Sequence, residues 1–141
     1  MTDLLTVLVK GEYSRFQQRG FTTYFCEEDM FMYPQVTDRN GVRILDISAS
    51  ARHHGIQSKT LVSSKLFSTW IREGAFSPER NIAMMCHAFL YAVDLDVEGL
   101  DSLEFSVHFY PKQGNFVAVN VRARTLLQAT KENILLELSS E

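Results

Sequence analysis

A chain of 141 residues with 45% hydrophobic and 22% charged residues has the composition of an ordinary globular protein, so we expect one domain with one core. A net charge of -3 argues against a protein that coats nucleic acid with its whole surface. The longest apolar run, around residues 82–93, is interrupted by His87 and Tyr91 and is shorter than the roughly 20 residues of a membrane-spanning helix.

The cysteines and the first residues bear on the compartment of the protein. Cys26 and Cys86 lie in apolar runs without a paired spacing, and the chain does not open with the pattern of a secretory signal peptide. A chain of this length buries roughly 70% of its unfolded surface, which is enough for a core without disulfides or a structural metal. We therefore expect a reduced, cytoplasmic protein with no membrane association.

The first third of the chain predicts its elements less sharply than the rest. Residues 3–19 have apolar side chains at helical spacing, but several are β-branched, so a helix and a short strand both remain open. Residues 21–33 are rich in aromatic residues on both sides of an acidic turn at 27–29, which is typical of a hairpin.

The middle of the chain predicts a turn, a short strand and a helix. The Asn-Gly pair within residues 37–41 is typical of a tight turn, and residues 42–45 follow as a strand. Asp46 or Ser48 then suits the cap of a helix that continues through Arg52.

A second helix follows after a short connection. Gly55 suits the left-handed residue that closes the first helix, and residues 60–62 predict a brief extended segment. Ser63 suits the cap of the second helix. The apolar residues of this helix that share one face are Leu66, Phe67, Trp70 and Ile71.

The clearest helix start in the chain is at Ser77. Serine is a capping residue, Pro78 occupies the first helical position, and Glu79 follows in the first turn. The apolar residues recur at helical spacing and predict a central core helix over 78–93, with Ile82, Met85, Cys86, Phe89, Leu90 and Val93 on its buried face.

The last third of the chain predicts strands. Residues 103–109 and 117–123 alternate apolar and polar side chains around a turn at 111–115, which predicts a hairpin. The remaining residues fit a helix, or a turn at 131–133 followed by a strand at 134–138. We favour the strand, because it gives the hairpin the third strand that a stable sheet needs.

These elements predict a single α+β domain over residues 1–141. We expect an antiparallel sheet of three to five strands, packed against two or three helices. The helix over 78–93 is expected to be the central one.

Charge is distributed unevenly along the chain. Residues 39–72 contain six basic residues and one acidic residue, whereas the remainder is strongly acidic, notably at 94–104. Such segregation is typical of a surface that meets a partner. The predicted binding residues are Arg43, Arg52, His53, His54, Lys59, Lys65 and Arg72.

The same stretch has the spacing of a helix-turn-helix. Ala51, Gly55 and Ile56 resemble the small residue and the turn of that motif, and Lys59 and Lys65 would suit phosphates. The simpler interpretation is a capped, glycine-broken helix pair with solvated lysines.

Catalytic and metal sites find little support. Adjacent histidines on a helix point about 100° apart, so His53 and His54 do not suit one metal ion, and Cys86 and His87 diverge in the same way. Residues 94–99 resemble half a calcium loop, but Phe105 occupies the position that requires glutamate. We expect no catalytic residue, metal or cofactor.

Residues 40–67, NGVRILDISASARHHGIQSKTLVSSKLF, resemble a family of uncharacterised domains found on plasmids, phages and other mobile elements. The chain departs from the family pattern at Lys59, where the family has proline, and at Phe67, where it has tryptophan. That proline favours an extended segment over a helix-turn-helix. The residues that fit are Gly41, Asp46, Ile47, Ser48, Ala51, Arg52, Gly55, Ile56, Val62, Ser63 and Leu66.

The resemblance implies accessory cargo of a mobile element. We therefore expect a non-catalytic cytoplasmic protein that binds a host protein or protein–nucleic-acid complex, with inhibition of a defence nuclease as a specific possibility. The contact surface would be the basic 39–72 stretch or the acidic 94–104 edge. The alternative is a nucleic-acid-binding regulator that uses the basic stretch. The sequence leaves the oligomeric state open.

Overall fold

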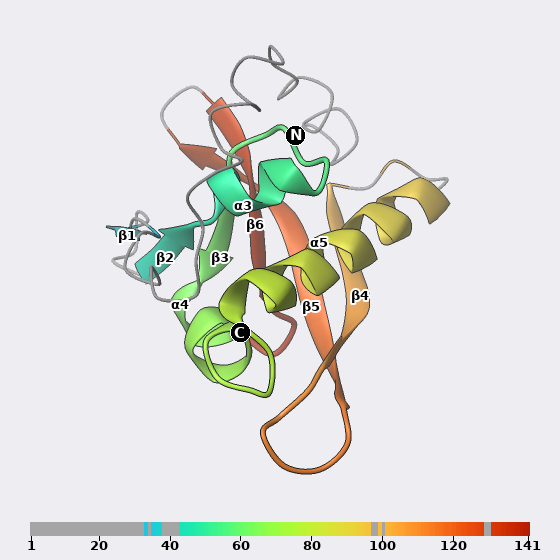
Figure 1. Cartoon of the computed structure of the whole chain (residues 1–141). Coiled ribbons are helices and arrows are strands. Elements are labelled where there is room, and N and C mark those ends of the chain that lie inside the picture. The colour runs from blue at the N-terminus through green and yellow to red at the C-terminus, as the bar shows by residue number, and fades with distance from the viewer. Residues whose placement is uncertain (1–32, 34, 38–42, 97–98, 100, 129–130) are drawn as a thin grey trace.

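The computed structural model describes Tyr33, residues 35–37, residues 43–96, Gly99, residues 101–128 and residues 131–141. Within these residues six strands form one sheet, and the helices cover one of its faces (Figure 1). The elements are β1 (Gln35–Thr37), β2 (Arg43–Asp46), α3 (Ser48–His53), β3 (Thr60–Ser63), α4 (Ser64–Leu66), the π-helical turn η2 (Phe67–Ile71), α5 (Pro78–Leu95), β4 (Ser102–Phe109), β5 (Val117–Gln128) and β6 (Lys131–Leu138).

The last strand in the chain, β6, lies near the middle of the sheet. The sheet order is β1-β2-β3-β6-β5-β4, and all neighbouring pairs are antiparallel except β3 and β6, which are parallel. Residues 133–138 of β6 are buried without interruption, as expected for a strand covered on both faces. β6 thus joins the β1–β3 half of the sheet to the β4–β5 hairpin.

The predicted α+β class is confirmed. Five strands have four or more residues, and the three-residue β1 adds a sixth at one edge. The sheet is mixed because β6 lies parallel to β3, a pairing between segments far apart in the sequence. The predicted final strand is present, but the predicted turn at 131–133 is wrong, since these residues already pair with β5. The predictions for residues 3–33 and 37–41 fall outside the described residues, apart from Tyr33 and Thr37.

The central helix forms as the sequence predicts. The Ser77 side chain accepts a hydrogen bond from the Arg80 backbone N–H at 3.2 Å, and Pro78 is the first helical residue. Five of the six predicted core residues are buried, while Leu90 is half-buried and lies beside Gly55. The buried five are Ile82, Met85, Cys86, Phe89 and Val93.

The predicted helix after Ser63 forms with an altered course. Ser63 caps it by accepting a hydrogen bond from the Leu66 N–H at 3.1 Å, but after one short α-helical turn the chain widens into η2. Buried Asn81 of α5 donates its side-chain amide to the Ile71 carbonyl at 2.9 Å, which satisfies a carbonyl at the end of the turn. This contact fixes η2 against the start of α5.

The other face of the sheet holds a second, smaller apolar cluster. Ile44, Leu61 and Leu135 are almost fully buried there, with Leu126 packed against them. The strands β5 and β6 also present charged side chains on this face, and these form the network described below.

Candidate interaction surface

The structure does not gather the seven predicted binding residues into one patch. Lys59 precedes β3 and Lys65 follows it in α4, so the two exposed lysines lie at opposite ends of a four-residue strand about 13 Å long. Arg43 is exposed at the start of β2. Arg72 is exposed at the end of η2 and forms a surface ion pair with Glu73 at 3.5 Å. The basic residues that are close together in the sequence therefore lie at several separate places on the surface.

The helix-turn-helix interpretation is wrong. The strand β3 lies between α3 and α4 and pairs with both β2 and β6. The six-residue α3 and the single turn of α4 therefore do not pack as consecutive helices in the way that motif requires.

One of the predicted residues, His54, contacts a third histidine. His54, the residue directly after α3, lies with its ring centroid 5.1 Å from that of His87 on α5 and 6.4 Å from that of His53, while Arg52 beside them is half-buried. Among the residues that the structure describes, no group of three His, Cys, Asp or Glu side chains could hold a metal ion. Sequence reasoning missed His87 as a partner because the α3–α5 packing brings it there.

This histidine cluster predicts a pH dependence of stability. Burial, and then the nearby His87 and His53, lower the pKa of His54 below its ordinary 6.5, while Glu79 acts in the opposite direction. The unfolded chain therefore takes up this proton at a higher pH than the folded protein does. We expect the free energy of unfolding to fall as the pH falls below about 6.5.

Urea unfolding at a series of pH values between 7.5 and 5 measures this effect. His54→Gln should unfold with a shallower pH dependence than the unmodified protein over the same range. Identical slopes in the two proteins would show that His54 makes no contribution.

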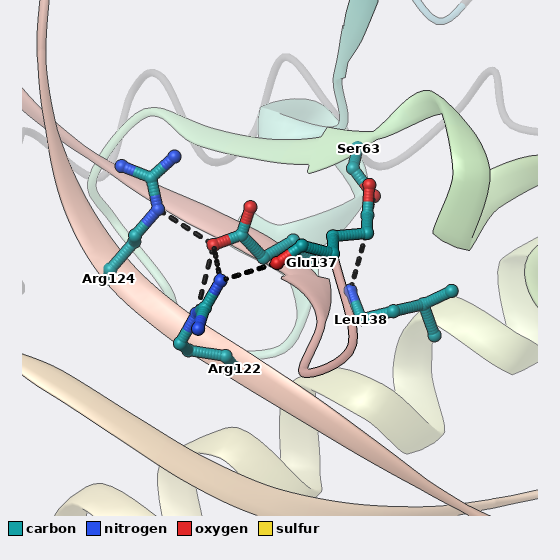
Figure 2. A network of polar contacts seen from close by, with 6 residues as sticks. Ser63, Arg122, Arg124, Glu137 and Leu138 are labelled. Carbon is teal, nitrogen blue, oxygen red and sulfur yellow. Dashed lines mark hydrogen bonds and ion pairs between the residues drawn. The ribbon is translucent and has the colours of Figure 1, made fainter.

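A charged network crosses β5 and β6 on the face opposite α5 (Figure 2). Arg122 and Glu137 are cross-strand partners. One carboxylate oxygen of Glu137 accepts hydrogen bonds from Arg122 Nε at 3.0 Å and from Arg124 Nε at 2.7 Å. The Glu137 side chain is only 9% exposed, against 29% and 37% for the two arginines. A buried carboxylate is thus matched by two partly exposed guanidinium groups.

Glu141 extends the network to β3. Its carboxylate accepts hydrogen bonds from the Ser63 hydroxyl at 2.6 Å and from the Leu138 N–H at 2.7 Å, and its backbone carbonyl accepts one from Arg122 at 3.3 Å. The charges of the two arginines and the two glutamates cancel. This balance favours a network that holds the strands together, which we call the clasp, over a site that binds a charged ligand. The alternation of apolar and polar side chains in the sequence predicts the strand that carries Arg122 but does not indicate the partners of the two arginines.

Replacing Glu137 tests this clasp. Glu137→Gln keeps the size of the side chain and removes the charge that two arginines share, so we expect the free energy of unfolding to fall by about 1–2 kcal/mol. The matched control is Glu73→Gln, which breaks an exposed ion pair with Arg72 and should cost at most about 0.5 kcal/mol. Equal urea midpoints for the two variants would show that the Glu137 network adds nothing beyond an exposed pair.

Aromatic and basic side chains gather at the end of the β4–β5 hairpin. We call this group the aromatic end patch, and it comprises Phe76, Arg80, His108, Tyr110 and Phe116. The Phe116 ring stacks on His108 with centroids 4.3 Å apart and lies 6.0 Å from Tyr110. Tyr110 meets Phe76 edge to face at 5.1 Å, and the Arg80 guanidinium lies 4.0 Å above the Phe76 ring.

Part of the patch is exposed, and a backbone hydrogen bond holds its segments together. Phe116 is 48% exposed and Tyr110 37% exposed. The Ala75 N–H donates to the Tyr110 carbonyl at 2.8 Å, which ties the segment before α5 to the end of β4. The sequence showed only a polar turn at 111–115 between two strands. The aromatic residues on both sides of that turn were the signal that could have identified the patch.

Polar groups near α3 and α5 form hydrogen bonds with one another. The Tyr33 hydroxyl and the Ser50 hydroxyl both donate to one carboxylate oxygen of Glu79, the latter at 2.7 Å. Burial and the bond to Glu79 raise the pKa of Tyr33 above its ordinary range. Burial, and then Glu79, raise the pKa of the Cys86 thiol to about 12, so this cysteine stays protonated at neutral pH.

Comparison with known proteins gives no further indication of function. No family model matches the chain, and no curated protein or solved structure matches it with significance. In the part of the chain that the structure describes, no helix is both long and apolar enough to cross a membrane.

Proposed function

We propose that the protein is a non-catalytic binding protein that recognises a partner protein through the aromatic end patch. The observation that carries this proposal is the exposure of the Tyr110 and Phe116 rings, which contact each other, with Tyr110 also against the half-buried Phe76 ring beneath Arg80. Aromatic and arginine side chains dominate the energetic centres of protein interfaces. Contacts among the rings reduce the conformational entropy that binding would otherwise remove.

The charges around the patch favour an acidic partner surface. Arg80 and Lys112 are both exposed there. A partner would place apolar side chains on the rings and acidic side chains at the basic rim, which favours fast and selective association. The resemblance of residues 40–67 to proteins of plasmids and phages supports a partner in the host cell, with a defence nuclease as the specific expectation.

Affinity capture from cells that carry the gene tests the proposal. We expect tagged protein to retain a host protein, and Phe116→Ser and Arg80→Glu to lose it, because each removes part of the patch without disturbing a buried side chain. The matched control is Lys65→Glu, which reverses an exposed charge outside the patch and should leave capture intact. Capture of the same protein by all three variants would overturn the proposal.

Nucleic acid is the other outcome of this experiment. Stacked rings beside cationic side chains also suit single-stranded nucleic acid. Fluorescence anisotropy with labelled single-stranded and duplex oligonucleotides distinguishes the two cases. Binding that weakens in Phe116→Ser would make the patch a nucleic-acid site, whereas binding that weakens in a Lys59→Glu, Lys65→Glu double variant would instead support the regulator predicted from the basic stretch.

A further inference from the structure

The strand β4 forms a long edge of the sheet. Among the described strands it pairs only with β5, in an unbroken register from Ser102 to Phe109. Proteins usually protect such edges with proline, lysine, a bulge or a very short strand. The eight residues SLEFSVHF contain no proline or lysine and a single charged residue, Glu104. Apart from the Glu104 charge, the strand has none of these protective features, and Ala75 binds the edge only beyond its end, at the Tyr110 carbonyl.

The backbone groups available at this edge can be identified. The Asp101 carbonyl accepts a hydrogen bond from the Thr125 N–H, so Asp101 directs its backbone toward β5. Because these directions alternate along an antiparallel strand, Glu104, Ser106 and His108 direct their N–H and C=O groups away from β5. Tyr110 continues the alternation, since its carbonyl accepts the Ala75 N–H from outside the sheet.

We propose that β4 is a homodimer interface, at which a second copy of the chain adds its own β4 antiparallel about a two-fold axis at Ser106. In this register Glu104 lies opposite His108 of the second copy, and the same pair recurs on the other side of the axis. All three side chains are exposed. In this position the His108 imidazole can donate a hydrogen bond to the Glu104 carboxylate, and such cross-strand side-chain pairs stabilise two paired strands.

The neighbouring registers lack this complementarity. Because facing residues in antiparallel strands share a face of the sheet, the axis must pass through a residue position. An axis at Glu104 would set two carboxylates against each other, and an axis at Phe105 would pair Glu104 with Ser106. Only the Ser106 register sets Glu104 directly opposite His108, and it also sets Phe105 against Val107 on the face that α5 covers.

The helix α5 is placed to cover the added strand. In Figure 1 its C-terminal turns continue past β4, away from the rest of the sheet. The Leu103 and Phe105 side chains of β4 pack against the core but are only partly buried. The strand of a second copy would cover more of the Leu103 and Phe105 side chains, and burial of apolar surface is the main source of favourable free energy in association.

Sedimentation velocity of the full chain tests the proposal. We expect a dimer, and we expect Ser106→Pro to be a folded monomer, because proline at this position removes an N–H that points away from β5. Glu104→Lys should weaken dimerisation about tenfold by placing a lysine opposite each His108. Arg80→Glu, which changes the aromatic end patch at a side chain that lies over Phe76, should leave the dimer intact, so this test does not depend on the proposed function.

A disulfide test fixes the register. In a Cys26→Ser background, Ser106→Cys should form a covalent dimer under mild oxidation, because facing hydrogen-bonded residues place their Cα atoms about 5.5 Å apart. Asn120→Cys, exposed on β5, is the control and should remain uncrosslinked. A protein that is monomeric at about 100 µM, a dimer that Ser106→Pro leaves intact, or a dimer that Ser106→Cys does not crosslink would each overturn the proposal.

Discussion

Phe89→Ala is expected to lower the free energy of unfolding by about 3–5 kcal/mol. The Phe89 side chain is fully buried on α5, and its ring centroid lies 5.7 Å from that of Phe105 on β4. Alanine would lose the transfer free energy of the ring and leave a cavity between the helix and the sheet. Folded domains are typically stable by only about 5–15 kcal/mol, so the variant should unfold at a much lower urea concentration.

The control for this substitution lies two residues earlier on the same helix. His87 is exposed, and His87→Ala should change the free energy of unfolding by no more than about 0.5 kcal/mol. If both variants unfold at the same urea midpoint, α5 does not pack on the sheet as described. Circular dichroism at 222 nm follows both transitions.

Gly74→Ala is expected to lower the free energy of unfolding by about 3 kcal/mol, the second largest effect. Gly74 has a φ of 136°, a conformation that residues with a side chain rarely adopt, and a Cβ added there would lie 2.8 Å from the Tyr110 carbonyl oxygen. The backbone strain accounts for about 1–3 kcal/mol. The close approach must also shift a carbonyl that already binds the Ala75 N–H. The same shift should disturb the aromatic end patch and weaken partner capture.

Gly114→Ala separates the two contributions. Gly114 also has a positive φ, 92°, but a Cβ added there would meet no atom within 4 Å. Gly114→Ala should therefore lower the free energy of unfolding only through the backbone strain of a positive φ, by about 1 kcal/mol. Equal losses for the two glycine variants, measured by urea unfolding, would mean that the contact between Gly74 and Tyr110 is unimportant.

The elements that the sequence predicted well are those whose signals are local. Ser77 and Pro78 begin α5, and the alternation in 103–109 and 117–123 gives the β4–β5 hairpin, because caps, turns and side-chain periods depend only on neighbouring residues. The predicted turn at 131–133 failed because polar residues that suit a turn also pair with β5. The partners of β6 could not be predicted, since Thr60 and Ile134 meet only when distant segments fold together.

The candidate surface was harder to predict for the same reason. The basic stretch at 39–72 is contiguous in sequence, yet β3 separates Lys59 from Lys65. The aromatic end patch has the opposite character, because Phe76 and Phe116 come from segments far apart in the chain. Tyr110 contacts both rings, and its contact with Phe76 exists only after the segment before α5 has packed against the end of β4. The distribution of charge along the sequence therefore predicted a basic surface whose residues are separated in the fold. It did not predict the aromatic end patch, whose residues come together only in the fold.

The place of β6 in the sheet has a consequence for the order of folding during synthesis. β1–β3 and the β4–β5 hairpin are both made before β6, yet β6 is the strand that hydrogen-bonds to both groups. Until residues 131–138 leave the ribosome, the two halves expose strand edges that only β6 can satisfy. Folding of the sheet must therefore wait for β6, and chains stalled before residue 131 should be the species that chaperones retain.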